Sequence, residues 1–109
     1  DDLASPNPKV WSNTLNCLGL SRQMQHDGPA AEHYFLQALE TALRSKEVDR
    51  DDKGSMYFNL GMVQVELGKI QSGLENLKAA RETCASGLNP NPDKIFMCDQ
   101  MIEKVLSSK

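Results

Sequence analysis

The 109-residue chain lacks several features that would place it in a functional class at once. No apolar run approaches the roughly 18 residues that a membrane-spanning helix needs, so we expect no membrane span. A net charge of −3 gives no basic face for a phosphate backbone, and we expect no nucleic-acid binding. No signal-peptide pattern opens the sequence, although the start at Asp1 leaves a removed targeting segment open. The remaining composition is that of one small globular domain.

A set of cysteines that could pair is also missing. Cys17, Cys84 and Cys98 are an odd number and have no C-x-x-C spacing. All three fall within predicted helices, so we expect reduced core residues in an intracellular protein of the cytoplasm or of an organelle. The acidic stretch at 46–53 has no calcium-loop spacing, and we expect neither a metal nor another cofactor.

An internal repeat organises what the sequence does contain. Its apolar and small positions recur at an offset of 42 (57−15, 60−18, 61−19, 73−31, 77−35 and 80−38). The pairs are Leu15 and Tyr57, Leu18 and Leu60, Gly19 and Gly61, Ala31 and Gly73, Phe35 and Leu77, and Ala38 and Ala80. Self-similarity at a fixed period indicates a stacked array, in which neighbouring units bury each other's apolar faces.

The spacing resembles the tetratricopeptide repeat, W-x2-L-G-x2-Y…A-x3-F, over about residues 12 to 87. Leu18-Gly19 and Leu60-Gly61 supply the L-G pair, whereas Arg22 and Gln64 replace the tyrosine. The offset exceeds the family's basic period of about 34 by eight, which resembles the long-repeat, kinesin-light-chain-like type. The resemblance implies an all-α fold, a right-handed stack of antiparallel helix hairpins with two repeats and a C-terminal capping helix.

The chain divides into four expected segments: an extended lead-in (1–8), a first repeat with a charged insert (9–53), a second repeat (54–87), and a linker with the capping helix (88–109). The 3.6-residue period and the breakers predict helices over 9–25, 29–45, 52–67, 70–85 and 92–107. Residues 46–53 either extend the second helix or form a loop. Gly28 and Gly68 are predicted to end the preceding helices, Gly28 with a positive φ.

Several positions have a predicted packing role. Trp11, Leu15 and Leu18 form one apolar stripe, with Trp11 sealing the open end of the stack or, alternatively, anchoring a partner. Gly73 is predicted at a close crossing of two helices. The last helix covers the fourth with Ile95, Cys98, Ile102 and Val105 and leaves Phe96 and Met97 off that face.

In tetratricopeptide arrays the first helix of each hairpin lines a concave groove, so the resemblance implies a binding site there. Helical spacing from the L-G pairs places Asn13 and Ser55 on the groove side together with seven predicted binding residues: Asn16, Leu20, Gln23, Phe58, Asn59, Met62 and Val65. If the last helix stacks like a third opening helix, it adds Gln100 to that side together with two more predicted binding residues, Phe96 and Met97. The predicted site therefore has nine residues. Burial under the last helix is the alternative for Phe58, Met62 and Val65. We expect a non-catalytic scaffold or adaptor that binds a peptide or a partner helix.

Three other functions are alternatives to this one. The resemblance places Asn59 where chaperone-tail-binding members have an asparagine, but Asn16 and Leu20 replace the expected lysine and asparagine. A structural or self-associating piece of a longer array would use Phe96 and Met97 as contacts. An enzyme would need Cys17, His26 and His33 in one pocket, and nothing in the sequence predicts such a pocket.

Overall fold

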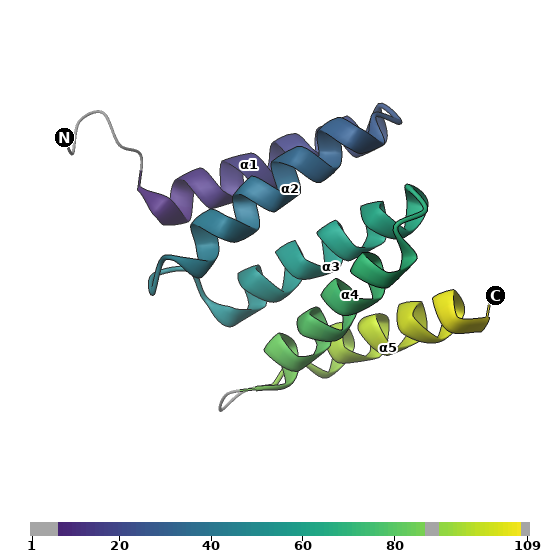
Figure 1. Cartoon of the computed structure of the whole chain (residues 1–109). Helices are drawn as coiled ribbons and strands as arrows, with labels where there is room; N and C mark the ends of the chain where they lie inside the picture. Colours follow the sequence, from purple (N-terminus) through teal and green to yellow (C-terminus); the bar gives the residue numbers. More distant parts are fainter. Residues whose placement is uncertain (1–6, 87–89, 108–109) are drawn as a thin grey trace.

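The computed structural model describes residues 7–86 and 90–107, and these residues form five helices and no strand. The helices are α1 (Pro8–Met24), α2 (Gly28–Leu43), α3 (Arg50–Glu66), α4 (Ile70–Ala85) and α5 (Pro92–Ser107). They stack in chain order, from the α1–α2 hairpin through the α3–α4 hairpin to α5 (Figure 1). The predicted all-α stack of hairpins is confirmed. Most of the expected lead-in (1–6), the junction of the second repeat with the linker (87–89) and the last two residues of the final segment (108–109) lie outside the described residues.

Small residues let the two helices of each hairpin approach closely. A Cβ atom on Gly19 would lie 2.5 Å from the Phe35 ring, and one on Gly61 would lie 2.9 Å from the carbonyl oxygen of Gly73. A Cβ on Gly73 would lie 2.6 Å from Cγ2 of Val65. Such distances are shorter than real contacts of a Cβ atom, so the predicted close crossing at Gly73 is confirmed.

Two apolar clusters hold the stack together. The larger one joins α1, α2 and α3, and its bulkiest members are Leu15, Phe35, Leu39, Met56, Leu60 and Val63. The smaller one contains Leu74, Leu77 and Val105, against which Met101 and Ile102 of α5 also pack. The second hairpin therefore rests on the first, and α5 covers α4 as the capping helix.

The docking of α5 repeats the docking of α3. Cys98 and Val105 are buried, and they follow the buried Met56 and Val63 of α3 by the repeat offset of 42 (98−56 and 105−63). Each of these two helices packs on the helix that precedes it. The residue types differ at other equivalent positions, and Glu103 of α5 stands where α3 has Gly61 (103−61).

The turn between α1 and α2 corrects one prediction. The residue with a positive φ is His26, at 62°, and not Gly28, which is the first residue of α2. Asp27 caps α2 by accepting a hydrogen bond from the backbone N–H of Ala30. The corresponding turn after α3 follows the prediction, because Gly68 has a φ of 85°.

The charged insert is shared between a loop and a helix. Arg44 to Asp49 separate the two hairpins, and Val48 in this stretch is buried in the larger cluster. Asp49 caps α3 through a 2.8 Å hydrogen bond from the N–H of Asp52, so α3 begins at Arg50, two residues before the predicted start at Asp52. The division of the two repeats after residue 53 stays a proposal.

The outer side of α1 is more exposed than predicted. Trp11 is 41% exposed and Leu18 is 39% exposed, whereas Leu60, the counterpart of Leu18, is 3% exposed. The difference arises because α2 covers this side of α3, while no helix among the described residues covers it on α1. The prediction that Trp11 seals the open end of the stack is therefore wrong, and within the stripe Leu15 is buried whereas Trp11 and Leu18 are not. Cys17 is also exposed and is not a core residue.

Candidate protein-binding groove

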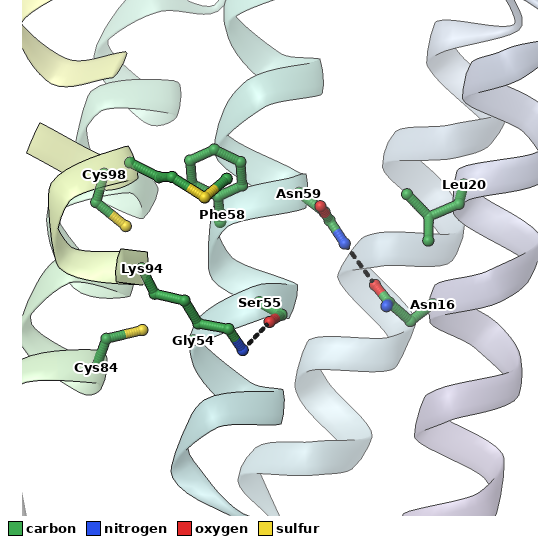
Figure 2. A pocket seen from close by; sticks show the side chains of 10 residues that line it. Asn16, Leu20, Gly54, Ser55, Phe58, Asn59, Cys84, Lys94 and Cys98 are labelled. Atoms are coloured by element: carbon green, nitrogen blue, oxygen red, sulfur yellow. Dashed lines mark hydrogen bonds between the residues drawn. The ribbon is translucent and has the colours of Figure 1, made fainter. Parts of the chain in front are cut away.

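A pocket of about 340 Å³ lies between α1 and α3, which are the first helices of the two hairpins, the helix α5 and the C-terminal end of α4 (Figure 2). We call it the groove pocket. Its lining residues are Asn16 and Leu20 of α1, Gly54, Ser55, Phe58 and Asn59 of α3, Cys84 of α4, and Lys94, Met97 and Cys98 of α5. Side chains from both hairpins and from the capping helix thus contribute to one site.

Two hydrogen-bonded links cross the polar part of the groove pocket. Asn59 Nδ2 donates to Asn16 Oδ1 at 3.1 Å and so connects α3 to α1. Lys94 Nζ donates to Ser55 Oγ at 2.8 Å and to the backbone carbonyl of Asp51 at 3.2 Å, connecting α5 to α3 (Figure 2). Lys94 is the single charged residue of the lining.

The rest of the groove pocket is apolar and rich in sulfur. Cys84 and Cys98 are buried, and burial raises the pKa of both thiols, that of Cys98 to about 11, so both are uncharged at neutral pH. A Cβ atom on Gly54 would lie 2.5 Å from Sγ of Cys84, so the glycine makes room for this thiol. Leu20 is 39% exposed and Met97 is 50% exposed.

The structure brings five of the nine predicted groove residues together in the groove pocket: Asn16, Leu20, Phe58, Asn59 and Met97. Helical spacing also placed Ser55 on the groove side, whereas sequence reasoning missed Gly54, Cys84, Lys94 and Cys98 as parts of the site. The position of Lys94 could have been found from Met97, because residues three apart share a helix face.

The other four predicted residues lie elsewhere. Gln23 lines a separate pocket of about 260 Å³ beside the turn at His26. Met62 and Val65 pack against the smaller apolar cluster, which corresponds to the burial alternative. Phe96 is 61% exposed and lines neither pocket.

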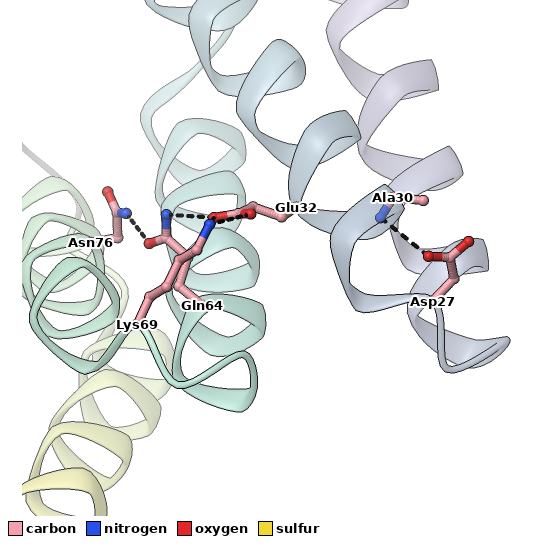
Figure 3. Close-up of polar contacts among 6 residues, drawn as sticks. All are labelled: Asp27, Ala30, Glu32, Gln64, Lys69 and Asn76. Atoms are coloured by element: carbon pink, nitrogen blue, oxygen red, sulfur yellow. Dashed lines mark hydrogen bonds and ion pairs between the residues drawn. The ribbon is translucent and has the colours of Figure 1, made fainter.

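A polar network fixes the second hairpin on the first (Figure 3). Glu32 of α2 pairs with Lys69 at 2.8 Å and accepts a 3.2 Å hydrogen bond from Nε2 of Gln64. Oε1 of Gln64 accepts a hydrogen bond from Asn76 Nδ2 at 2.6 Å. Burial alone would raise the pKa of Glu32, but the hydrogen bonds from Lys69 and Gln64 hold it below 4.5. Gln64, which stands where the repeat pattern has tyrosine, thus links α2 to α4 through α3.

The three side chains that an enzyme would need in one pocket are Cys17, His26 and His33, and all three are exposed. His26 lines the pocket beside the turn, whereas Cys17 and His33 line neither that pocket nor the groove pocket. Their acidic neighbours have other contacts, because Asp27 caps α2 and Glu32 pairs with Lys69. Within the part of the chain that the structure describes, no three histidine, cysteine, aspartate or glutamate side chains are arranged to hold a metal ion. None of the described helices has the length and hydropathy to span a bilayer.

Comparison with known proteins identifies the family. The family model described as tetratricopeptide repeat matches residues 12–86, which include both hairpins. Searches of curated proteins and of solved structures gave no match. The matched segment covers well over half of the chain and contains the L-G pairs and the close crossings described above. The chain belongs to the tetratricopeptide repeat family.

Proposed function

We propose that the groove pocket and the adjoining surfaces of α1, α3 and α5 bind a peptide or a helix of a protein partner, and that the protein is a scaffold or adaptor. Tetratricopeptide repeats generally mediate protein–protein interactions and are not enzymes. The three free thiols support a reducing compartment, for which we propose the cytoplasm.

One observation carries the proposal: exposed apolar side chains flank an amide pair. Leu20 and Met97 come from the two outer helices of the groove, and both line one pocket while remaining exposed. Asn16 and Asn59 bond to each other there and retain further donors and acceptors that can pair with a peptide backbone. Met97 can adapt to different partner side chains because its thioether is unbranched and polarisable.

Chaperone-tail binding receives less support than a general peptide groove. An acidic tail with several carboxylates needs several cations, and Lys94 is the single cation of the groove pocket. Asn16 and Leu20 still occupy positions where the tail-binding members have other residues. We therefore propose a partner held mainly by apolar contacts.

The test selects peptides from a displayed random library on the immobilised chain and measures their dissociation constants by calorimetry. Leu20→Ala and Met97→Ala should each weaken the selected peptide about fivefold or more, because each removes more than about 1 kcal/mol of apolar contact. Leu36→Ala and Leu43→Ala are matched controls. Leu36 has the same 39% exposure as Leu20, and Leu43, at 52%, is close to Met97 at 50%, yet both belong to α2 and neither lines the groove pocket. The controls should change the affinity less than about twofold.

Two results would contradict the proposal. The first is that no peptide is enriched over a bare-surface selection. The second is that the control substitutions weaken the selected peptides as much as Leu20→Ala and Met97→Ala, which would place the binding surface outside the groove.

A further inference from the structure

The groove pocket has the size and lining of a small-molecule site, in addition to its place in a peptide groove. Its volume of about 340 Å³ falls within the range of about 300–1,000 Å³ that is usual for pockets that bind small ligands. Such pockets are mostly apolar and contain a few convergent polar groups, and the groove pocket has this character. Its polar groups are a lysine, two asparagines and a serine from three different helices.

Lys94 gives the site a positive charge that the described protein does not neutralise. Its ammonium group donates hydrogen bonds to two uncharged acceptors, Ser55 Oγ and the backbone carbonyl of Asp51. The ion pairs of residues 7–86 and 90–107 join Lys69 to Glu32 and Arg81 to Asp99, and none includes Lys94. An ammonium group has three donors, so one remains. An anionic oxygen is its complement, because a charge-assisted hydrogen bond is stronger than a neutral one.

The apolar wall of the groove pocket favours an aromatic body over an aliphatic one. Phe58 offers a ring, and Cys84, Met97 and Cys98 supply three sulfur atoms around the same space. Sulfur atoms make favourable contacts with aromatic rings, and aromatic pairs gain energy beyond the area they bury. A carboxylate on a short linker from such a ring would reach the polar wall that Lys94 and Asn59 form.

We propose that the groove pocket binds a small aromatic carboxylic acid, with its ring against Phe58 and Met97 and its carboxylate hydrogen-bonded to Lys94. This site goes beyond the proposed protein-binding function and needs no protein partner. A ligand held here would contact Met97 and Leu20, the same side chains that we assign to peptide binding. The bound acid would therefore compete with the peptide and regulate the groove.

The experiment titrates the full chain with phenylacetate as the probe and follows the backbone amide signals by NMR. Saturable shifts are expected at Gly54, Ser55, Met97 and Cys98, which line the groove pocket. Phenylacetamide keeps the ring but has no charge, and cyclohexylacetate keeps the charge but has no aromatic ring. Both should bind more weakly than phenylacetate. Because a hydrogen bond to a charged group is stronger than one between neutral groups, phenylacetamide should bind about tenfold more weakly, a difference of about 1.4 kcal/mol.

Substitutions of Lys94 separate the contribution of its charge to phenylacetate binding from the contribution of the pocket's shape. Lys94→Gln should weaken phenylacetate about tenfold and leave the binding of phenylacetamide unchanged, whereas Lys94→Arg should retain most of the affinity. Lys104→Gln is the matched control, since Lys104 is an exposed lysine of α5 that does not line the groove pocket. Circular dichroism of each variant checks the fold. If Lys94→Gln fails to fold, the comparison of the three probes on the unaltered chain still decides.

Several outcomes would overturn the inference. Shifts that do not saturate, or that scatter over the surface, would show that phenylacetate has no site in the groove pocket. Equal affinity for phenylacetamide would refute the role of Lys94, and equal affinity for cyclohexylacetate would refute the aromatic preference. If selected peptides bind but phenylacetate does not, the small-molecule site fails while the proposed function stands. If phenylacetate binds and no peptide does, the proposed function fails.

Discussion

Substitution of Gly73 tests the close crossing of α3 and α4, because two opposing effects have different sizes there. Alanine in place of glycine within a helix normally stabilises by about 1 kcal/mol. At Gly73, however, the added Cβ would lie 2.6 Å from Val65 Cγ2, 2.9 Å from the carbonyl oxygen of Gly61 and 3.1 Å from the backbone nitrogen of Val65. Two of these three atoms belong to the backbone and cannot move aside alone.

The expected result of Gly73→Ala is a net loss of stability. Overpacking of this kind costs about 1–3 kcal/mol, which exceeds the gain in helix propensity. We expect the free energy of unfolding to fall by about 1 kcal/mol and the melting temperature to fall by about 4 °C. Guanidinium titration followed by circular dichroism measures the change, and the slope of the titration should stay constant. The neighbouring exposed substitution Ser72→Ala is the control and should be neutral or slightly stabilising.

A double-mutant cycle locates the clash. Val65→Ala removes Cγ2, so Gly73→Ala should cost less in the Val65→Ala background, with a coupling energy of about 1 kcal/mol. The contact with the Gly61 carbonyl remains, so the rescue should be partial. The reasoning is refuted if Gly73→Ala stabilises the protein by the propensity difference, or if its cost is the same in both backgrounds.

Three further predictions concern charge, thiol access and assembly. The pKa of Glu32 is lowered in the folded state, so its stabilising contribution is complete above pH 4.5 and is lost as the pH falls through the lower folded value. The difference in unfolding free energy between the natural chain and Glu32→Gln, about 1 kcal/mol at neutral pH, should therefore shrink below pH 4.5, and a constant difference would contradict this. A thiol reagent at neutral pH should label Cys17 rapidly and should label Cys84 and Cys98 much more slowly, because these two are buried and their pKa values are raised. Equal labelling rates for the three cysteines would contradict the burial of Cys84 and Cys98 in the groove pocket. Light scattering should show a monomer at micromolar concentration, whereas a dimer that forms with rising concentration would favour self-association through the exposed Phe96.

The repeat made much of the fold predictable. Gly19, Gly61 and Gly73 stand at positions where only a small residue fits against a neighbouring helix. Their spacing in the sequence therefore predicts where the two helices of each hairpin cross. The apolar period placed the five helices within two residues of their observed starts. These features were predictable because they are local to one hairpin or depend on contacts between hairpins. Both kinds of contact recur at the offset of 42 residues.

What the sequence did not reveal depends on which neighbours are present and on how segments far apart in the chain meet. Leu18 and Leu60 occupy equivalent positions, yet within residues 7–86 and 90–107 a preceding helix covers Leu60 and none covers Leu18. Lys94 reaches the groove pocket from α5, and its place depends on how α5 docks across α4. The pairing of Glu32 with Lys69 joins residues 37 apart, and no periodic pattern in either helix indicates it.

The way α5 docks on α4 should allow further hairpins to be inserted into the stack before α5. Cys98 and Val105 meet α4 at the positions by which Met56 and Val63 meet α2, so α5 should fit equally well on a duplicate of α4. A designer could therefore splice a second copy of the α3–α4 hairpin ahead of α5 and keep the terminal helix unchanged. The helix α5 differs from α1 and α3 at one close-packing position. Glu103 places a carboxylate where Gly19 of α1 meets the ring of Phe35 and where Gly61 of α3 meets the carbonyl oxygen of Gly73. Each added hairpin would lengthen the surface proposed to bind a partner, and α5 would still form its final helix.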